Sequence, residues 1–122
     1  MILGFGTKAE LIFATNIVLK LKRDLIKIGR AAHQDQNPLP LRLIDDGRRI
    51  EIDNTVLTNP ISKVHGEFTW NKQLKKYEYT DLSRNGSWIN DVKISRGKKQ
   101  ALNNKDRLAL GNATLKVQII YP

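Results

Sequence analysis

The sequence has 122 residues, of which 21 are Lys or Arg and 12 are Asp or Glu, and its net charge is +9. This length suits one domain over residues 1–122, and the short apolar runs exclude membrane insertion, because a membrane helix needs roughly 20 consecutive apolar residues. The absence of cysteine excludes disulfides and thiolate zinc sites, and the positive charge favours an anionic partner such as a phosphorylated protein, a nucleic acid or an anionic membrane surface.

The N-terminal segment, residues 1–13, is either an extension or a first strand. It contains no sustained apolar run of the kind found in secretory signals. We therefore expect a cytoplasmic location.

Short segments with strand character follow one another from there to the end of the chain. In the last of them, Leu115, Val117 and Ile119 alternate with polar residues, which is the period-two pattern of a strand with one buried face. Turn-forming pairs such as Asn-Pro, Asp-Gly and Asn-Gly separate the segments, which indicates an all-β, antiparallel two-sheet sandwich. The expected strands lie at 16–22, 25–29, 39–44, 48–53, 65–70, 75–81, 87–90, 92–94, 100–102, 107–111 and 114–121.

Several polar residues that could bind a ligand lie in or beside the expected turns, where a sandwich can assemble a site. Arg30 follows an apolar strand and Gly29, so its planar guanidinium is placed to clamp a phosphate or carboxylate. Ser62 offers a hydroxyl and Lys63 a charge. The structural alternative is that Ser62 only satisfies the backbone of a local turn.

The segment DLSRNGSWIN, residues 81–90, contains more polar groups than a hairpin requires. Asn85-Gly86 alone would explain a type I′ turn, in which both central residues have positive φ. Asn85 also carries amide donors and a carbonyl acceptor that could hold a peptide backbone. Arg84 adds a second cation, and Ser83 and Ser87 add hydroxyls.

Enzyme chemistry is not indicated. A triad of Ser62, His65 and Asp81 is conceivable, but no nucleophile-elbow sequence surrounds Ser62. His33 and His65 are the only histidines and lie in unrelated contexts, so we expect no metal site and no cofactor.

Taken in order, these motifs resemble those of the forkhead-associated (FHA) domain family. The motifs are Gly-Arg at 29–30, Ser-x-x-His at 62–65, Asn-Gly-Ser-x-x-Asn at 85–90 and LNNKDRLALG at 102–111. The resemblance runs from about residue 17 to residue 121, and the conjunction is more specific than any one motif. It implies an FHA/SMAD-like sandwich of about eleven strands that binds a phosphothreonine-containing protein or peptide and has no catalytic activity.

The resemblance also implies a role for each matching residue. Arg30 would reach the phosphate, the hydroxyl of Ser62 would bond a phosphate oxygen, and Lys63 would add backbone or ammonium contacts. Asn85 would hold the peptide backbone, and Arg84, which does not match the family pattern, would present a second guanidinium to the phosphate. Structural support would come from Gly29, His65, Gly86 and Asn90.

Two departures from the family pattern carry expectations of their own. Ser62 lies farther from Arg30 than is usual in the family, which predicts an insertion at 31–55 that contains a hairpin around Asp45-Asp46-Gly47. Arg84 stands where the family usually has a small hydroxyl residue. Because FHA domains are usually one part of a longer chain, we expect a larger multidomain protein.

Two other readings remain open. The basic surface could bind nucleic acid or another polyanion, with Trp70, Tyr77, Tyr79 and Trp88 as stacking residues. However, the strand spacing of Tyr77 and Tyr79 is explained more simply by core packing. Alternatively, the domain could serve assembly through the added hairpin.

Overall fold

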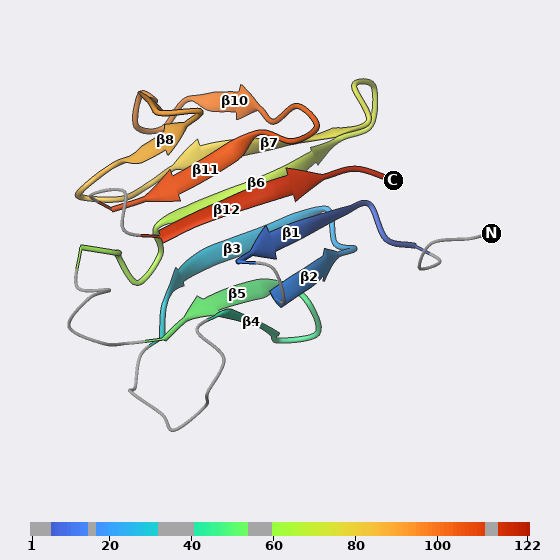
Figure 1. Cartoon of the computed structure of the whole chain (residues 1–122), viewed down its shortest axis with the longest axis horizontal. Coiled ribbons are helices and arrows are strands. Elements are labelled where there is room, and N and C mark those ends of the chain that lie inside the picture. Colours follow the sequence, from blue (N-terminus) through green and yellow to red (C-terminus); the bar gives the residue numbers. More distant parts are fainter. Residues whose placement is uncertain (1–5, 15–16, 32–40, 54–59, 112–114) are drawn as a thin grey trace.

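Two six-stranded β-sheets form the molecule in the computed structural model, which describes residues 6–14, 17–31, 41–53, 60–111 and 115–122. Figure 1 shows the sheets lying one in front of the other. The first sheet has the order β2 (Ile17–Leu21), β1 (Ala9–Phe13), β12 (Leu115–Ile120), β11 (Arg107–Leu110), β8 (Ser87–Ile89) and β9 (Val92–Lys93). The second has the order β10 (Lys99–Ala101), β7 (Lys76–Asp81), β6 (Gly66–Asn71), β3 (Leu25–Arg30), β5 (Arg49–Ile52) and β4 (Leu41–Ile44).

The predicted all-β sandwich is confirmed, with one difference in strand direction. Every strand pair is antiparallel except β3 with β5, which run parallel with Lys27 opposite Arg49. A parallel pair needs a long connection between its strands, and the chain between β3 and β5 includes the whole of β4. The structure has twelve strands within the described residues, close to the expected eleven.

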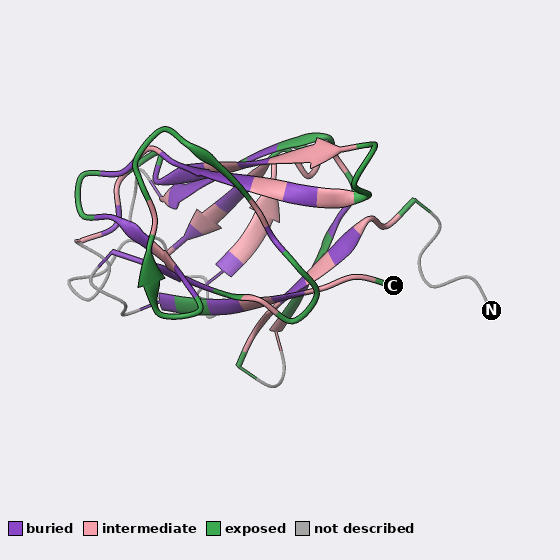
Figure 2. Ribbon diagram, turned by 90° about the horizontal axis from the view of Figure 1, so that it is seen from above, coloured by how far each residue is buried: buried purple, intermediate pink, exposed green. Residues whose placement is uncertain are grey.

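The core lies between the sheets and follows from the alternation of side chains along the strands. Leu115, Val117 and Ile119 of β12 are buried, while Lys116 between them is exposed. In Figure 2 buried segments alternate with partly exposed ones along the strands, and much of the exposed ribbon belongs to loops. Within the described residues, no helix has the length and apolarity to cross a membrane.

The predicted hairpin around Asp45-Asp46-Gly47 forms between β4 and β5 at the edge of the second sheet. Asp45, Asp46 and Gly47 all have positive φ, and Arg42 pairs with Glu51 across the two strands at 3.2 Å. β4 also contacts β2 of the first sheet, so the hairpin lies where the sheet edges approach each other. Residues 32–40 and 54–59 of the predicted insertion lie outside the described residues.

The strand directions bring several connections together at one end of the sandwich. The end of β3, the start of β6 and the β7–β8 connection lie on the left in Figure 1. Gly111, just after β11, joins them, since its N–H donates to the carbonyl of Gly86 at 3.0 Å. Segments from four parts of the chain thus meet at this end.

Candidate functional site

A hollow of about 330 Å³ at this end is lined by residues from three separate segments. Arg30 comes from the end of β3, and the 83–86 loop supplies Arg84 and Asn85. The loop before β6 supplies Ser62 and Lys63, with apolar Ile61 beside them. The structure therefore brings together the five residues that the sequence predicts as ligand-binding: Arg30, Ser62, Lys63, Arg84 and Asn85.

The hollow is strongly cationic. Arg30, Lys63 and Arg84 each contribute a positive charge, and no Asp or Glu is among the described residues that line the hollow. Guanidinium groups present fixed forks of donors that match the oxygens of a phosphate or carboxylate. The arrangement suits an anionic ligand.

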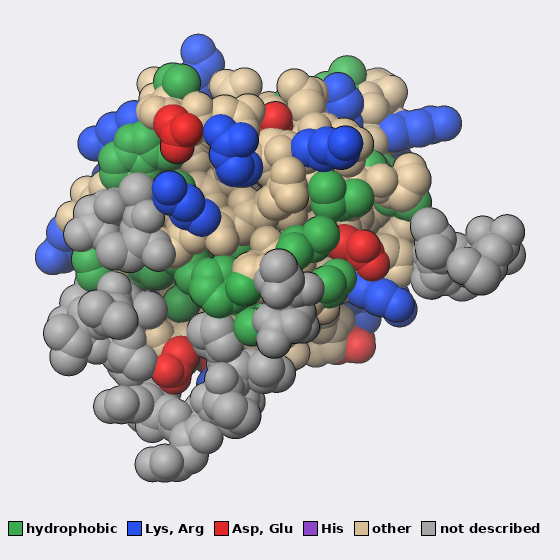
Figure 3. All heavy atoms as spheres, viewed as in Figure 1, with side chains coloured by type: hydrophobic (Ala, Val, Ile, Leu, Met, Phe, Trp, Pro, Cys, Tyr) green, Lys and Arg blue, Asp and Glu red, His purple; other side chains and the backbone are tan. Residues whose placement is uncertain are grey.

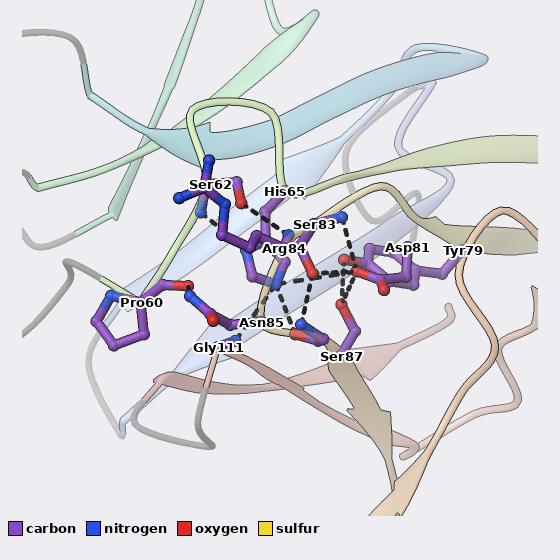
Figure 4. Close-up of polar contacts among 11 residues, drawn as sticks. Pro60, Ser62, His65, Tyr79, Asp81, Ser83, Arg84, Asn85, Ser87 and Gly111 are labelled. Carbon is purple, nitrogen blue, oxygen red and sulfur yellow. Dashed lines mark hydrogen bonds and ion pairs between the residues drawn. The ribbon is translucent and has the colours of Figure 1, made fainter.

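Hydrogen bonds between the two loops fix the positions of Ser62 and Asn85. The Ser62 hydroxyl accepts the Arg84 N–H at 3.2 Å, which leaves its own proton available to a ligand oxygen. The Asn85 side-chain amide donates to the carbonyl of Pro60 at 2.8 Å. Figure 4 shows Asn85 turned toward Pro60, and Arg84 alongside Ser62.

His65 lies beneath the loops and joins them. The Ser62 N–H donates to its Nδ1 at 3.1 Å, and its Nε2 lies 2.7 Å from the carbonyl of Gly86. These two bonds require the neutral tautomer with the proton on Nε2, which donates to Gly86. Burial lowers the pKa of His65 below its usual 6.5, against the opposing effects of Gly86 and Asp81.

This geometry also explains why the residues do not form a catalytic triad. His65 accepts the backbone N–H of Ser62 and leaves the hydroxyl to Arg84. A nucleophile and its base would instead share the hydroxyl proton. His65 therefore supports the two loops through hydrogen bonds to their backbone.

Asp81, at the end of β7, organises the 83–86 loop from below. Its Oδ1 accepts the hydroxyls of Ser83 at 2.6 Å and Ser87 at 2.8 Å, together with the Ser83 N–H at 3.2 Å. The Ser83 hydroxyl in turn accepts the Gly86 N–H at 2.7 Å. All these contacts appear in Figure 4.

The buried positions of Ser83 and Ser87 were not evident from the sequence, where they read as further hydroxyls for a ligand. Ser83 is 2% exposed and Ser87 is fully buried. Both hydroxyls point inward, and Tyr79 completes the network through a 2.9 Å bond to Ser87. The available signal was the Asp-x-Ser spacing, since an Asp side chain commonly accepts the N–H two residues on.

Asn85-Gly86 does not form the type I′ turn that the pair alone would allow. Gly86 has φ of +99°, but Asn85 is not among the described residues with positive φ. A type I′ turn links two paired strands, whereas this loop leads from β7 in the second sheet to β8 in the first. The Asn-Gly pair therefore lies in a loop that connects the two sheets.

Gly29 permits a close approach between β3 and the Ser62–Lys63 loop. A Cβ at this position would lie 1.8 Å from the backbone oxygen of Lys63. The Arg30 N–H donates to the carbonyl of Ser62 at 2.9 Å, which holds the loop against the strand end. Only glycine allows this contact without a shift.

Arg49 is a further contributor that the sequence analysis did not identify. It lies at the start of β5, and its Nη2 donates to the Lys63 carbonyl at 3.1 Å. It does not line the hollow. The contact between Arg49 and Lys63 depends on the parallel pairing of β5 with β3. No local sequence pattern predicts that pairing.

Asn90 lies apart from the hollow, at the end of β8, with φ of +51°. Its side-chain amide donates to Asp106 at 2.9 Å, and its oxygen accepts the Arg107 N–H at 2.9 Å. Asp106 also accepts the Asn103 N–H at 2.7 Å. The asparagine thus joins the end of β8 to the turn before β11.

The aromatic residues considered for nucleic-acid stacking are mostly packed inside. Tyr77 and Tyr79 are fully buried, and Trp70 packs against Tyr77 with ring centroids 5.0 Å apart. Trp88 is partly exposed and carries Lys93 over its ring at 5.6 Å. On the face in Figure 3 the Lys and Arg side chains are spread singly and form no continuous stripe.

Comparison with known proteins gives one family match and a set of similar folds. The family model described as FHA domain matches residues 26–111. The chain is 31% identical over 109 residues to a protein of Dictyostelium discoideum named as the probable serine/threonine-protein kinase fhkB. That match covers 86% of this chain and 10% of the other, so the chain spans about a tenth of the length of this relative.

Among the solved structures with a similar fold are two FHA domains bound to phosphothreonine peptides. The N-terminal FHA domain of S. cerevisiae Rad53, in complex with a phosphothreonine peptide, has a TM-score of 0.67 at 18% identity and covers 93% of both chains. The FHA domain of MEK1, in complex with a HOP1 phosphothreonine peptide, has a TM-score of 0.60 at 21% identity, over 94% of this chain and 97% of that one.

Proposed function

Because the chain belongs to the FHA domain family, we propose that it is a binding module, without catalytic activity, that recognises phosphothreonine-containing segments of other proteins. One observation carries this proposal. Three cations, a serine hydroxyl and an asparagine amide from three segments surround one hollow, and within the part of the chain that the structure describes no acidic residue lines it. A phosphate carries about −1.5 to −2 charge and three strong acceptor oxygens, which these donors match.

Each residue has a distinct part in this proposal. Arg30 and Arg84 bind phosphate oxygens through their guanidinium groups, and Lys63 adds an ammonium or backbone contact. Ser62 donates its hydroxyl proton, which its bond from the Arg84 N–H leaves available. Asn85 exchanges its bond to Pro60 for the peptide backbone next to the phosphothreonine.

The remaining residues hold the loops in place. His65 links Ser62 to Gly86, and Gly29 lets the Ser62–Lys63 loop lie against β3. Gly86 provides the positive φ at the end of the other loop. Asn90 supports the framework through Asp106, away from the ligand.

We also propose that the domain works within a larger chain. The fhkB protein, of which this chain matches 10%, is named as a probable kinase, so a longer protein would combine recognition with another activity. In the same proposal, the chain acts in phosphorylation-dependent signalling and lies in the cytoplasm. The 31–55 insertion contributes Arg49, which supports the Lys63 carbonyl.

The test is binding, at about 0.15 M salt, to matched degenerate peptide pools centred on phosphothreonine, phosphoserine or threonine. Retention of the phosphothreonine pool is expected. If each charge-assisted hydrogen bond is worth about 1.5–3 kcal/mol, Arg30→Ala and Ser62→Ala should each weaken binding by roughly 10- to 150-fold. Unchanged affinity in both variants would refute the proposal.

A nucleic-acid ligand is the competing outcome of the same experiment. Binding driven by counterion release falls steeply with salt and does not respond to threonine phosphorylation. Equal retention of all three pools, together with salt-sensitive binding of a DNA or RNA oligonucleotide, would favour that reading. The separate Lys and Arg side chains on the face in Figure 3 and the buried tyrosines argue against it.

A further inference from the structure

A second hollow lies on the other side of Arg84. It has a volume of about 410 Å³ and is lined by Ser62, Leu82, Ser83, Arg84 and Arg96. Ser62 and Arg84 line both this hollow and the first, so the two are neighbours. Arg84 therefore stands between two spaces that a ligand could occupy.

Arg96 belongs to a loop that the structure holds firmly in place. The loop connects β9 to β10, and its Gly97 N–H donates to the carbonyl of Asp81 at 2.8 Å. Before it, the Ile94 N–H donates to the carbonyl of Ser87 at 3.0 Å. Both acceptors belong to the segment that carries the 83–86 loop, so Arg96 and Arg84 are supported from the same framework.

The charge around the two hollows exceeds what one phosphate would neutralise. Arg30, Lys63, Arg84 and Arg96 line them, and the described part of their lining contains no Asp or Glu. Asp81, beneath the loop, is 2% exposed and already accepts both serine hydroxyls. A phosphate carries about −1.5 to −2 charge, so one phosphothreonine does not balance the summed charge of Lys63, Arg84 and Arg96.

We propose that the second hollow holds a second phosphorylated side chain of the same peptide, bound by Arg96 together with Arg84, which lies between the two hollows and contacts both phosphates. This inference rests on the proposed function, which places the phosphothreonine in the first hollow. Arg96 is exposed, so its guanidinium reaches the ligand without breaking a buried contact. Two guanidinium groups suit a dianionic phosphate better than a monoanionic carboxylate, because each can make parallel bonds to a pair of its oxygens.

The shared lining also limits the distance between the two phosphates. A peptide in extended conformation advances roughly 3.3 Å per residue, so two hollows that share lining residues are reached within a short stretch of the peptide. The preferred ligand is therefore a closely spaced doubly phosphorylated segment. Such a ligand would make binding depend on two phosphorylation events.

The experiment uses peptides with one central phosphothreonine and a phosphoserine moved through each of the four positions on either side. Affinity is measured by fluorescence anisotropy at about 0.15 M salt. At one spacing, the doubly phosphorylated peptide should bind about tenfold or more tightly than the singly phosphorylated one, a gain of about 1.4 kcal/mol. Glutamate at the same position should give a much smaller gain.

Arg96→Ala is the decisive variant, and Lys98→Ala is its matched control. Both residues are exposed, lie in the same loop and carry one positive charge, but only Arg96 lines the hollow. Arg96→Ala should abolish most of the gain and leave the affinity for the singly phosphorylated peptide within about twofold. Lys98→Ala should retain the gain.

Several outcomes would overturn the inference. The first is that the second phosphate gives no gain in affinity at any spacing. The second is an equal loss of the gain in Arg96→Ala and Lys98→Ala, which would indicate general electrostatic attraction. The third is an equal gain from glutamate, which would assign the hollow to an acidic side chain. Failure of the singly phosphorylated peptide to bind would refute the proposed function itself. Normal binding of that peptide without a gain would refute only the second hollow.

Discussion

Replacing Ser83 by alanine should destabilise the domain by about 3 kcal/mol, although the proposed function assigns this serine no contact with the phosphothreonine. Its hydroxyl donates to Asp81 at 2.6 Å and accepts the Gly86 N–H at 2.7 Å, in a position that is 2% exposed. A hydrogen bond to a charged group contributes about 1.5–3 kcal/mol, and a buried N–H left without an acceptor costs about 1–3 kcal/mol. The lower limits already sum to about 2.5 kcal/mol.

The assay is equilibrium unfolding in urea. With a slope near 2 kcal/mol per molar, the midpoint should fall by about 1.5 M while the slope stays unchanged. The variant should remain folded without denaturant, since domains are typically stable by about 5–15 kcal/mol. Affinity for the phosphothreonine peptide should also fall, because the 83–86 loop loses the contact that fixes Gly86 beside Asn85.

Ser95→Ala is the control, since Ser95 is an exposed serine in the β9–β10 loop. It should change the free energy of unfolding by less than about 0.5 kcal/mol. A loss of less than about 1 kcal/mol in Ser83→Ala would show that water or a loop shift replaces both bonds, and the account of the buried network would be incorrect.

Three further predictions concern the supports of the loops. Burial lowers the pKa of His65, so His65 binds fewer protons in the folded than in the unfolded protein, and its contribution to stability should be complete above about pH 6.5 and fall below it. The free energy of unfolding in urea should therefore depend less on pH in His65→Gln than in the wild type. Parallel pH curves for the two proteins would contradict this. Gly29→Ala should lower the free energy of unfolding by about 1–3 kcal/mol and weaken peptide binding, because the new Cβ would meet the Lys63 carbonyl. A variant as stable and as tightly binding as the wild type would show that β3 and the Ser62–Lys63 loop do not lie this close. Arg49→Gln should lower peptide affinity several-fold with less than about 1 kcal/mol of destabilisation, whereas Arg48→Gln, at an exposed arginine that pairs with Asp46, should not; equal effects would indicate net charge alone.

Local patterns predicted much of the fold. The alternation of Leu115, Val117 and Ile119 with polar residues located β12 and its buried face, and Asp45-Asp46-Gly47 located the β4–β5 turn. The order of the motifs indicated the FHA family, which the family match confirms. These features depend on residues close in sequence or on the motif order.

The features that the sequence did not reveal depend on contacts between distant segments. The parallel pairing of β3 with β5, and with it the contact of Arg49 with Lys63, requires knowing which strand edges meet. The local sequence of Asn85-Gly86 suits a hairpin turn, but the flanking strands belong to different sheets. The five predicted ligand residues surround one hollow, and their roles stay predictions until binding is measured.

The pairing of β1 with β12 determines where the domain can be tethered. Glu10 lies opposite Ile120, so the start of β1 and the end of β12 are adjacent, on the right in Figure 1 and opposite the hollows. A fluorescent protein, an immobilisation tag or a neighbouring domain joined on either side would therefore attach at the far end of the sandwich. The binding loops would lie at the opposite end from any such attachment. A partner could therefore approach them without steric interference from the attached group.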